Sequence, residues 1–223
     1  MRKANVTQLT LIIGNKNYSS WSLRPWLAMK QSGIEFLEVR IPLDTPTSQQ
    51  EILKYSPAGK VPILLQGELT IWDSLAICEY IAELFPQANL WTQDIEKRAI
   101  ARCISAEMHS GFPNLRQHMP MNCRGRLPGK GIQPKVQADI NRITTIWREC
   151  REKFVNEGDL LFGSFTIADA MFAPVASRFV TYDVKLDPIS SAYVEQIYAL
   201  PAMQEWLKAA SLELEYLEQE EIY

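Results

Sequence analysis

Short apolar runs in the first 86 residues predict a small sheet flanked by helices. Runs with the length of strands occur at residues 9–13, 37–41, 62–65 and 69–72. In the second run, Leu37, Val39 and Ile41 alternate with charged residues, which indicates a half-buried strand. The last two runs are separated by Gly67-Glu68, which predicts a hairpin. Helical spacing occurs at residues 23–33, 49–55 and 74–85. The predicted order is strand, helix, strand, helix, strand, strand, helix.

From residue 95 onward the apolar spacing is helical. Helices are expected at residues 95–112, 140–154, 166–179, 191–199 and 201–217. Thr166 and Asp169 have the spacing of a capping box, with aspartate in place of the usual glutamate. Pro86 to Gln93 is expected to be a linker. We therefore expect an α/β domain at residues 8–86 and an all-α domain at residues 95–220.

Composition narrows the class of protein. The 223-residue chain has a net charge of −3, which gives no reason to expect nucleic-acid binding. No apolar run approaches the roughly 20 residues that span a bilayer, so no membrane partner is expected. The four cysteines are widely separated, with no CxxC pair and no histidine cluster, so no metal site is expected. Free cysteines and the lack of a signal-peptide pattern favour a cytoplasmic protein.

The hairpin region has the features of a site for a small peptide. Val61 precedes Pro62 at the head of a strand, where a cis bond would turn Val61 outward and let its N–H and C=O pair with an extended peptide. Asp73 and Ser74 stand where a helix begins, among free N–H groups. A carboxylate for an ammonium group, beside donors for a carboxylate, is a receptor for a free α-amino acid end. Plain helix capping by these two residues is the alternative.

Four segments in this order resemble the cytosolic glutathione S-transferase family. They are residues 19–25, 56–62, 72–74 and 163–169, which read SSWSLRP, SPAGKVP, WDS and GSFTIAD. The resemblance covers nearly the whole chain and is to serine-type bacterial members with some zeta-class character. It implies a thioredoxin-like N-terminal domain, an all-α C-terminal domain and a homodimer. It also implies glutathione as co-substrate, with no tightly bound cofactor and no metal.

The resemblance places a catalytic hydroxyl just after the first strand. Serine-type members carry it a few residues before an arginine on the first helix, here Arg24, so Ser19 is the first candidate. A hydroxyl that donates to the sulfur, together with the positive end of a helix, favours loss of the thiol proton. Ser20 and Tyr18 are the alternatives, and a turn or cap role for Ser19 stays open.

The resemblance also implies which residues bind the two substrates. For glutathione they are Lys60, Val61, Pro62, Asp73 and Ser74; for the electrophile they are His109, Phe112 and Arg116. Lys60 would reach the glycyl carboxylate, and Pro62 would shape the site. The ordinary alternatives are a solvated lysine and a structural histidine.

The expected activity is detoxification by transfer, in which the glutathione thiolate attacks an electrophilic carbon of a mostly apolar small molecule. Residues 19–24 are also similar to the zeta-class pattern Ser-Ser-Cys-x-Trp-Arg, but Trp21 occupies the cysteine position. That difference weakens isomerase or disulfide chemistry that needs a second thiol. The alternative function is that of a non-catalytic member used for protein interaction or regulation. The sequence does not identify the electrophile.

Overall fold

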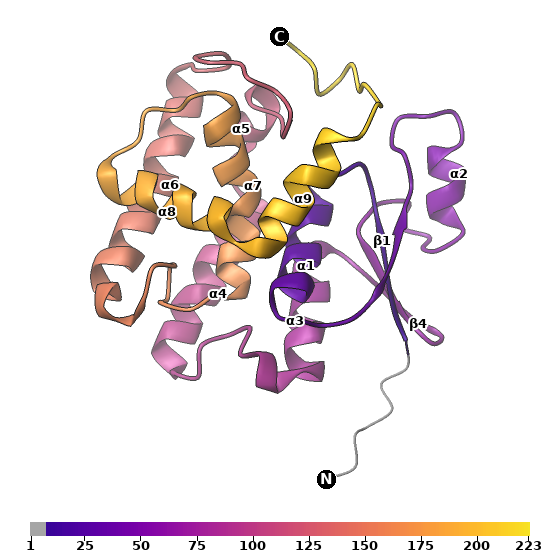
Figure 1. Cartoon of the computed structure of the whole chain (residues 1–223), viewed down its shortest axis with the longest axis horizontal. Helices are drawn as coiled ribbons and strands as arrows, with labels where there is room; N and C mark the ends of the chain where they lie inside the picture. The colour runs from indigo at the N-terminus through magenta and orange to yellow at the C-terminus, as the bar shows by residue number, and fades with distance from the viewer. Residues whose placement is uncertain (1–7) are drawn as a thin grey trace.

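Four short strands and three helices form the N-terminal part of the computed structural model, which describes residues 8–223 (Figure 1). The strands are β1 (Leu9–Ile13), β2 (Leu37–Arg40), β3 (Ile63–Gln66) and β4 (Leu69–Trp72). The helices are α1 (Ser20–Gln31), α2 (Ser48–Leu53) and α3 (Ser74–Leu84). Each strand and helix expected from the first 86 residues is present.

The strands form one mixed sheet in the order β2-β1-β3-β4. β1 pairs parallel with β2 and antiparallel with β3, and β3 and β4 form the expected hairpin. Ile12 and Ile63 on one sheet face pack with Ile52 of α2, whereas Leu11 and Leu64 on the other face join a core that includes α1 and α3. This three-layer arrangement confirms the thioredoxin-like domain.

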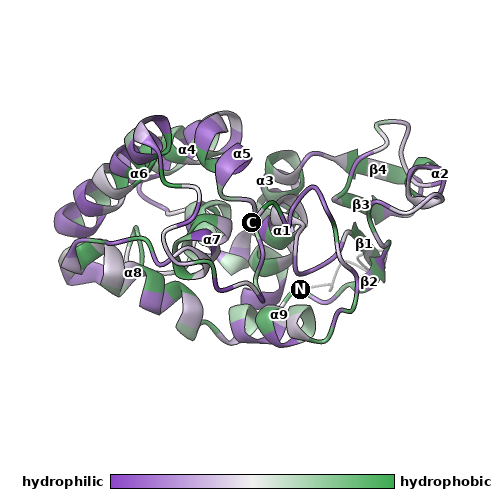
Figure 2. Cartoon of the chain, turned by 90° about the horizontal axis from the view of Figure 1, so that it is seen from above, coloured by the Kyte–Doolittle hydropathy of each residue, from purple (hydrophilic) through white to green (hydrophobic). Residues whose placement is uncertain are grey.

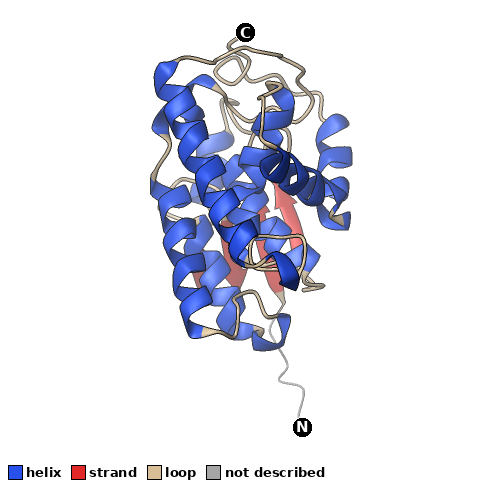
Figure 3. Ribbon diagram, turned by 90° about the vertical axis from the view of Figure 1, so that its left-hand side faces the viewer, coloured by secondary structure: helices blue, strands red, loops and turns tan. Residues whose placement is uncertain are grey.

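The rest of the chain is helical (Figure 3). The helices are α4 (Ile95–Ser110), α5 (Pro113–His118), α6 (Pro134–Lys153), α7 (Ile167–Thr181), α8 (Pro188–Ala199) and α9 (Pro201–Ser211), with 3-10 turns η1 (Pro86–Ala88) and η2 (Val155–Glu157). α7 is buried along almost its whole length and packs against α1 and α4, so it joins the two parts of the chain. Figure 2 shows the strands mainly in hydrophobic green, whereas much of α6 is hydrophilic purple.

The capping box at the start of α7 is confirmed. Asp169 is fully buried, and its Oδ2 accepts from the backbone N–H of Thr166 at 2.8 Å. Its Oδ1 accepts from the backbone N–H of Leu161 and the hydroxyl of Tyr193. One carboxylate therefore fixes the start of α7, the preceding loop and α8 together.

Two details differ from the expectation. Leu37 is 56% exposed because β2 is an edge strand, so the prediction of a half-buried strand is wrong at that position. α9 ends at Ser211 rather than at Leu217. The residues after it, 212–223, form an irregular C-terminal tail that returns to the first domain, where Glu213 accepts from the N–H groups of Lys16 and Asn17. These contacts replace the last expected turns of the helix.

Candidate active site between the sheet domain and the helices

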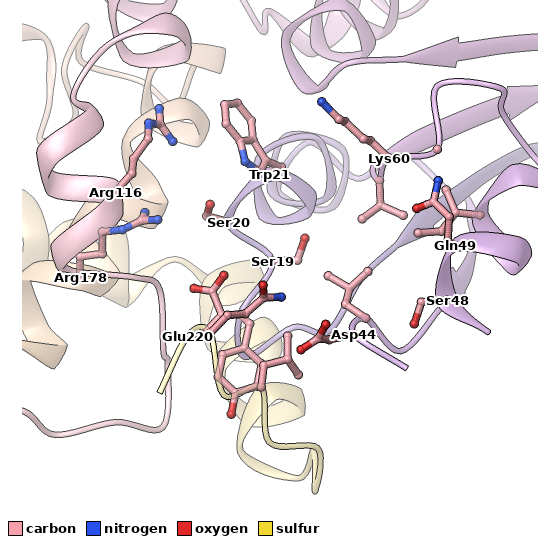
Figure 4. Close-up of a pocket in the computed structure, with 17 residues that line it drawn as sticks. Ser19, Ser20, Trp21, Asp44, Ser48, Gln49, Lys60, Arg116, Arg178 and Glu220 are labelled. Atoms are coloured by element: carbon pink, nitrogen blue, oxygen red, sulfur yellow. The ribbon is translucent and has the colours of Figure 1, made fainter. Parts of the chain in front are cut away.

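Two adjoining cavities lie between the sheet domain and the helices. The Asp73 cavity, of about 570 Å³, is lined by Pro62, Trp72, Asp73, Ser74 and His109, together with Ala58. The Ser19 cavity, of about 450 Å³, is lined by Ser19, Ser20, Arg116, Arg178 and Glu220 among others (Figure 4). Trp21, Lys60 and Val61 border both cavities, so the two share a wall.

Asp73 is the N-cap residue of α3. Its Oδ1 accepts from the backbone N–H groups of Leu75 at 2.9 Å and Ala76 at 3.1 Å. The backbone of Asp73 has a positive φ of 78°. Ser74, the first residue of α3, is buried, and its Oγ has no hydrogen-bond partner among residues 8–223. A free hydroxyl at a helix N-terminus beside a carboxylate can bind both ends of a zwitterionic α-amino acid group.

Val61 and Pro62 border the Asp73 cavity next to the sheet. The Val61–Pro62 peptide bond is cis. Neither the N–H nor the C=O of Val61 hydrogen-bonds another backbone group among residues 8–223. An extended peptide lying in this cavity would therefore find a free donor and a free acceptor on Val61.

Ser19 and Ser20 lie at the start of α1, in the Ser19 cavity (Figure 4). Ser19 is the N-cap residue; its Oγ accepts from the N–H of Ser22 and donates to the Oγ of Ser22 at 2.7 Å. No hydrogen bond of the Ser20 hydroxyl to another group of residues 8–223 is present. Both hydroxyls are thus placed at the positive end of a helix, and that of Ser20 is uncommitted.

Tyr18 uses its hydroxyl elsewhere. The hydroxyl donates to Glu221 Oε1 at 2.7 Å and accepts from Arg124 Nη2 at 2.9 Å. Burial and the neighbouring Glu221 raise the pKa of Tyr18. The Tyr18 hydroxyl is therefore bonded to the C-terminal tail and is not free to act at the start of α1.

Two guanidinium groups lie against the Trp21 ring. The Arg24 and Arg116 Cζ atoms are 4.3 Å and 4.7 Å from the centroid of its ring, and His109 meets the ring edge-on at 5.4 Å. Arg24 is fully buried, and none of its three side-chain nitrogens has a partner among residues 8–223. Burial, reinforced by Arg116, lowers the pKa of Arg24 well below its usual range. The wall shared by the cavities therefore has two guanidinium groups packed against its Trp21 ring.

Arg178 and Glu220 border the Ser19 cavity on the side of the helices and the tail (Figure 4). Arg178 is buried on α7, where its Nε donates to the carbonyl of Met119 at 2.7 Å. Burial raises the pKa of Glu220, and the positive charge of Arg178 opposes that shift. Neither residue is predicted from the sequence: an arginine inside an apolar helix was a usable signal for Arg178, whereas Glu220 lies beyond the end expected for α9.

The residues expected to bind the electrophile are not together in the structure. Arg116 lines the Ser19 cavity, whereas His109 lines the Asp73 cavity. Phe112 is 6% exposed, belongs to the hydrophobic core and lines neither of the two cavities. Lys60, expected near a glycyl carboxylate, borders both.

Residues 8–223 contain no group of three or more His, Cys, Asp or Glu side chains that could hold a metal ion. Over the same residues, no helix is long and apolar enough to cross a membrane.

Sequence comparison with known proteins identifies one family. Residues 18–84 match the family model described as glutathione S-transferase, N-terminal domain. The chain is 32% identical to maleylacetoacetate isomerase of Rattus norvegicus over 76% of this chain and 77% of that one. It is 34% identical to glutathione S-transferase Z1 of Arabidopsis thaliana, over 85% and 89%.

Solved structures show the same fold. A glutathione transferase homolog from Burkholderia with bound glutathione superposes with a TM-score of 0.70 at 25% identity, covering 92% of this chain and 99% of that one. A Tau class glutathione S-transferase from mango superposes with a TM-score of 0.68 at 18% identity, covering 92% and 96%. Together with the sequence relatives, this shows that the chain belongs to the glutathione S-transferase family and has zeta-like character.

Proposed function

We propose that this protein is a glutathione transferase that holds glutathione in the Asp73 cavity and an electrophile in the Ser19 cavity. The observation that carries the proposal is the wall shared by the two cavities, formed by Trp21, Lys60 and Val61. A tripeptide lying along Val61 can place its sulfur at this wall, next to Ser19 and Ser20. The two substrates then meet where α1 begins.

The Asp73 cavity supplies groups that match the glutamyl end of glutathione. Asp73 pairs with the α-ammonium group, and the free hydroxyl of Ser74 donates to the α-carboxylate. The backbone of Val61 pairs with the cysteinyl residue, and Lys60 is within the same cavity for the glycyl carboxylate. The Ser74 hydroxyl and the Val61 backbone groups have no protein partner among residues 8–223, whereas Asp73 already accepts from Leu75 and Ala76.

Catalysis then consists of stabilising and positioning the thiolate. The thiol gives its proton to solvent, and a hydroxyl of Ser19 or Ser20 donates to the sulfur at the N-terminus of α1. The guanidinium groups of Arg24 and Arg116, which pack against Trp21 of the shared wall, favour the anion further. The sulfur attacks the electrophilic carbon, a carbon–sulfur bond forms, and the leaving group departs with its electron pair.

A second candidate is glutathione-dependent isomerisation, favoured by the similarity to proteins named maleylacetoacetate isomerase. Arg116 and Arg178 border the Ser19 cavity and suit an acidic second substrate. The thiolate would add to an activated double bond, the new single bond would rotate, and the thiolate would leave again. Trp21 in place of the zeta-class cysteine is the feature that makes transfer our first choice.

Family membership also leads us to propose a homodimer. We further propose a cytoplasmic location, which the four free cysteines support. The alternative of a non-catalytic interaction protein would not require free Ser74 and Val61 groups at a cavity.

The proposal is tested by retention on immobilised glutathione, together with two activity assays. One assay measures conjugation of a reactive aryl halide, and the other measures cis–trans isomerisation of maleylacetoacetate. We expect retention and conjugation. Retention with isomerisation alone would select the second candidate, and no retention would favour the interaction protein.

A further inference from the structure

The glutathione site that we propose receives one side chain from the helical domain. His109 of α4 reaches across the cleft, and its Nε2 lies 3.0 Å from Asp73 Oδ2. The other Asp73 oxygen is occupied by the N–H groups of Leu75 and Ala76. Asp73 is therefore held at both oxygens, by its own helix and by the opposite domain.

The surroundings of His109 favour a neutral ring that donates from Nε2. Its Nδ1 is buried and has no partner among residues 8–223. Three charged groups face the ring: Asp73 from the start of α3, Arg24 from α1 and Arg116 from α5. On α4 itself, the nearby Glu107 is paired with Arg142. Burial lowers the pKa of His109, the two arginines lower it further, and Asp73 opposes them.

We propose that His109 is a positioning residue that orients Asp73 for the α-ammonium group of glutathione. Binding of this ammonium group and protonation of His109 exclude each other. With neutral His109, the Asp73 carboxylate keeps its charge for the ammonium group. Once His109 takes up a proton, its own charge neutralises Asp73 and repels the ammonium group. The inference rests on the proposed binding of glutathione at Asp73.

The sign of the pH dependence follows. Affinity should be highest above the pKa of His109 and should decline as the pH falls through it, below the usual value of about 6.5. The ligand carboxyls titrate near pH 3.5 and the amine near pH 8, so neither changes charge between pH 5 and pH 7. S-methylglutathione has no thiol that could titrate. His109 is then the group at the proposed contact that titrates in this range.

The first test uses the fact that the chain has two histidines, His109 and His118. The imidazole resonances are followed by NMR against pH, with and without S-methylglutathione, and the H118Q variant assigns them. We expect the ligand to lower the pKa of His109 and to leave the resonances of His118 in place. A His109 pKa that is unchanged or raised by a ligand that binds would overturn the inference.

The second test measures affinity for S-methylglutathione by calorimetry at pH 5, 6 and 7. Wild type should bind about three- to tenfold more weakly at pH 5 than at pH 7. H109Q places a non-titrating amide donor near the position of Nε2, so it should bind at pH 7 within about threefold of wild type and lose the pH dependence. H109F removes the donor and should bind about tenfold more weakly at pH 7. H118Q should behave as wild type does.

The outcomes separate the two proposals. If wild type and H118Q fail to bind, the proposed function fails. If both bind but H109Q keeps the wild-type pH dependence, or H109F binds as wild type does, only the role of His109 fails. An analogue without the α-amino group is the ligand control, because its affinity should not fall between pH 7 and pH 5 as that of S-methylglutathione does.

Discussion

The Oγ atoms of Ser19 and Ser22 lie 2.7 Å apart, and Ser22 Oγ also accepts from the N–H of Gly14 at 3.1 Å. This chain of hydrogen bonds ties the residue that follows β1 to the first turn of α1. Ser19 is thereby fixed at the helix start, but its proton is directed to Ser22. Ser19 must turn away from Ser22 to donate to a sulfur in the cavity, whereas Ser20 can donate without breaking a protein hydrogen bond.

Replacing these serines separates catalysis from capping. We expect Ser19→Ala to lower kcat/KM for aryl halide conjugation about tenfold or more, which corresponds to about 1.4 kcal/mol of barrier. The variant should also unfold about 1 kcal/mol more easily, because the N-cap of α1 is lost. Steady-state kinetics and urea denaturation measure the two effects.

Ser20→Ala is the matched control, since Ser20 does not cap the helix. A tenfold loss in Ser20→Ala with wild-type turnover in Ser19→Ala would move the sulfur contact to Ser20. Full turnover in both single variants and in the double variant would contradict a serine-type mechanism.

Tyr18→Phe should leave conjugation within about twofold of wild type, because the phenol bonds Arg124 and Glu221. The change should instead loosen residues 212–223, through loss of hydrogen bonds that contribute about 1 kcal/mol each. Amide hydrogen exchange of the tail gives the readout. A large fall in kcat with an unchanged tail would instead place Tyr18 at the sulfur.

Glu213 should stabilise the loop that carries Ser19. Its carboxylate accepts from the N–H of Lys16 at 2.7 Å and of Asn17 at 2.9 Å. Glu213→Ala leaves both donors without an acceptor, so we expect a loss of about 2–4 kcal/mol in unfolding free energy. Glu215→Ala, which removes an ion pair with Arg40, should lose less than about 1 kcal/mol. Equal losses in urea denaturation would show that Glu213 has no special role.

Local rules were enough to predict the sheet domain and the start of α7. Gly67-Glu68 sets the hairpin, and Thr166 with Asp169 sets the capping box, because both depend on residues close in sequence. The tail was not predictable in this way. Leu217 continues the apolar spacing of α9. The tail is nevertheless held by the Glu213 carboxylate, which accepts from the N–H groups of Lys16 and Asn17, almost 200 residues earlier.

The candidate site was predictable only in part for the same reason. Asp73, Ser74 and Val61 lie on one continuous segment and line one cavity, as the motif implied. The partner of Asp73, however, is on α4, and the packing of α4 against α3 decides that His109 meets Asp73 and not the Ser19 cavity. Periodicity assigns a residue to a helix face but does not say which group that face meets.

Burial of Asp169 gives a pH dependence of stability. Burial raises the pKa of Asp169 to about 6, above the usual 3.8, despite its hydrogen bonds. A raised folded-state pKa means that the stabilising contribution of Asp169 to the free energy of unfolding is complete below about pH 4. It is lost as the pH rises toward 6. The unfolding free energy of wild type relative to Asp169→Asn should therefore fall between pH 4 and pH 6, by about 3 kcal/mol at most. A difference that rises over this range would mean that the hydrogen bonds outweigh burial.

The most direct test compares the affinity for glutathione of two variants, Asp73→Asn and Asp94→Asn. Both residues are aspartate N-caps, but only Asp73 lies at the cavity. Asp73 accepts two backbone N–H groups at the start of α3, and Asp94 does the same at the start of α4, with distances of 2.9 and 3.0 Å. Both variants keep a capping oxygen, so both helix starts should stay capped; Asp73→Asn also alters the contact with His109. Calorimetry at pH 7 should give an affinity at least about tenfold weaker for Asp73→Asn and a wild-type affinity for Asp94→Asn. Wild-type affinity in Asp73→Asn would contradict a glutathione site at Asp73.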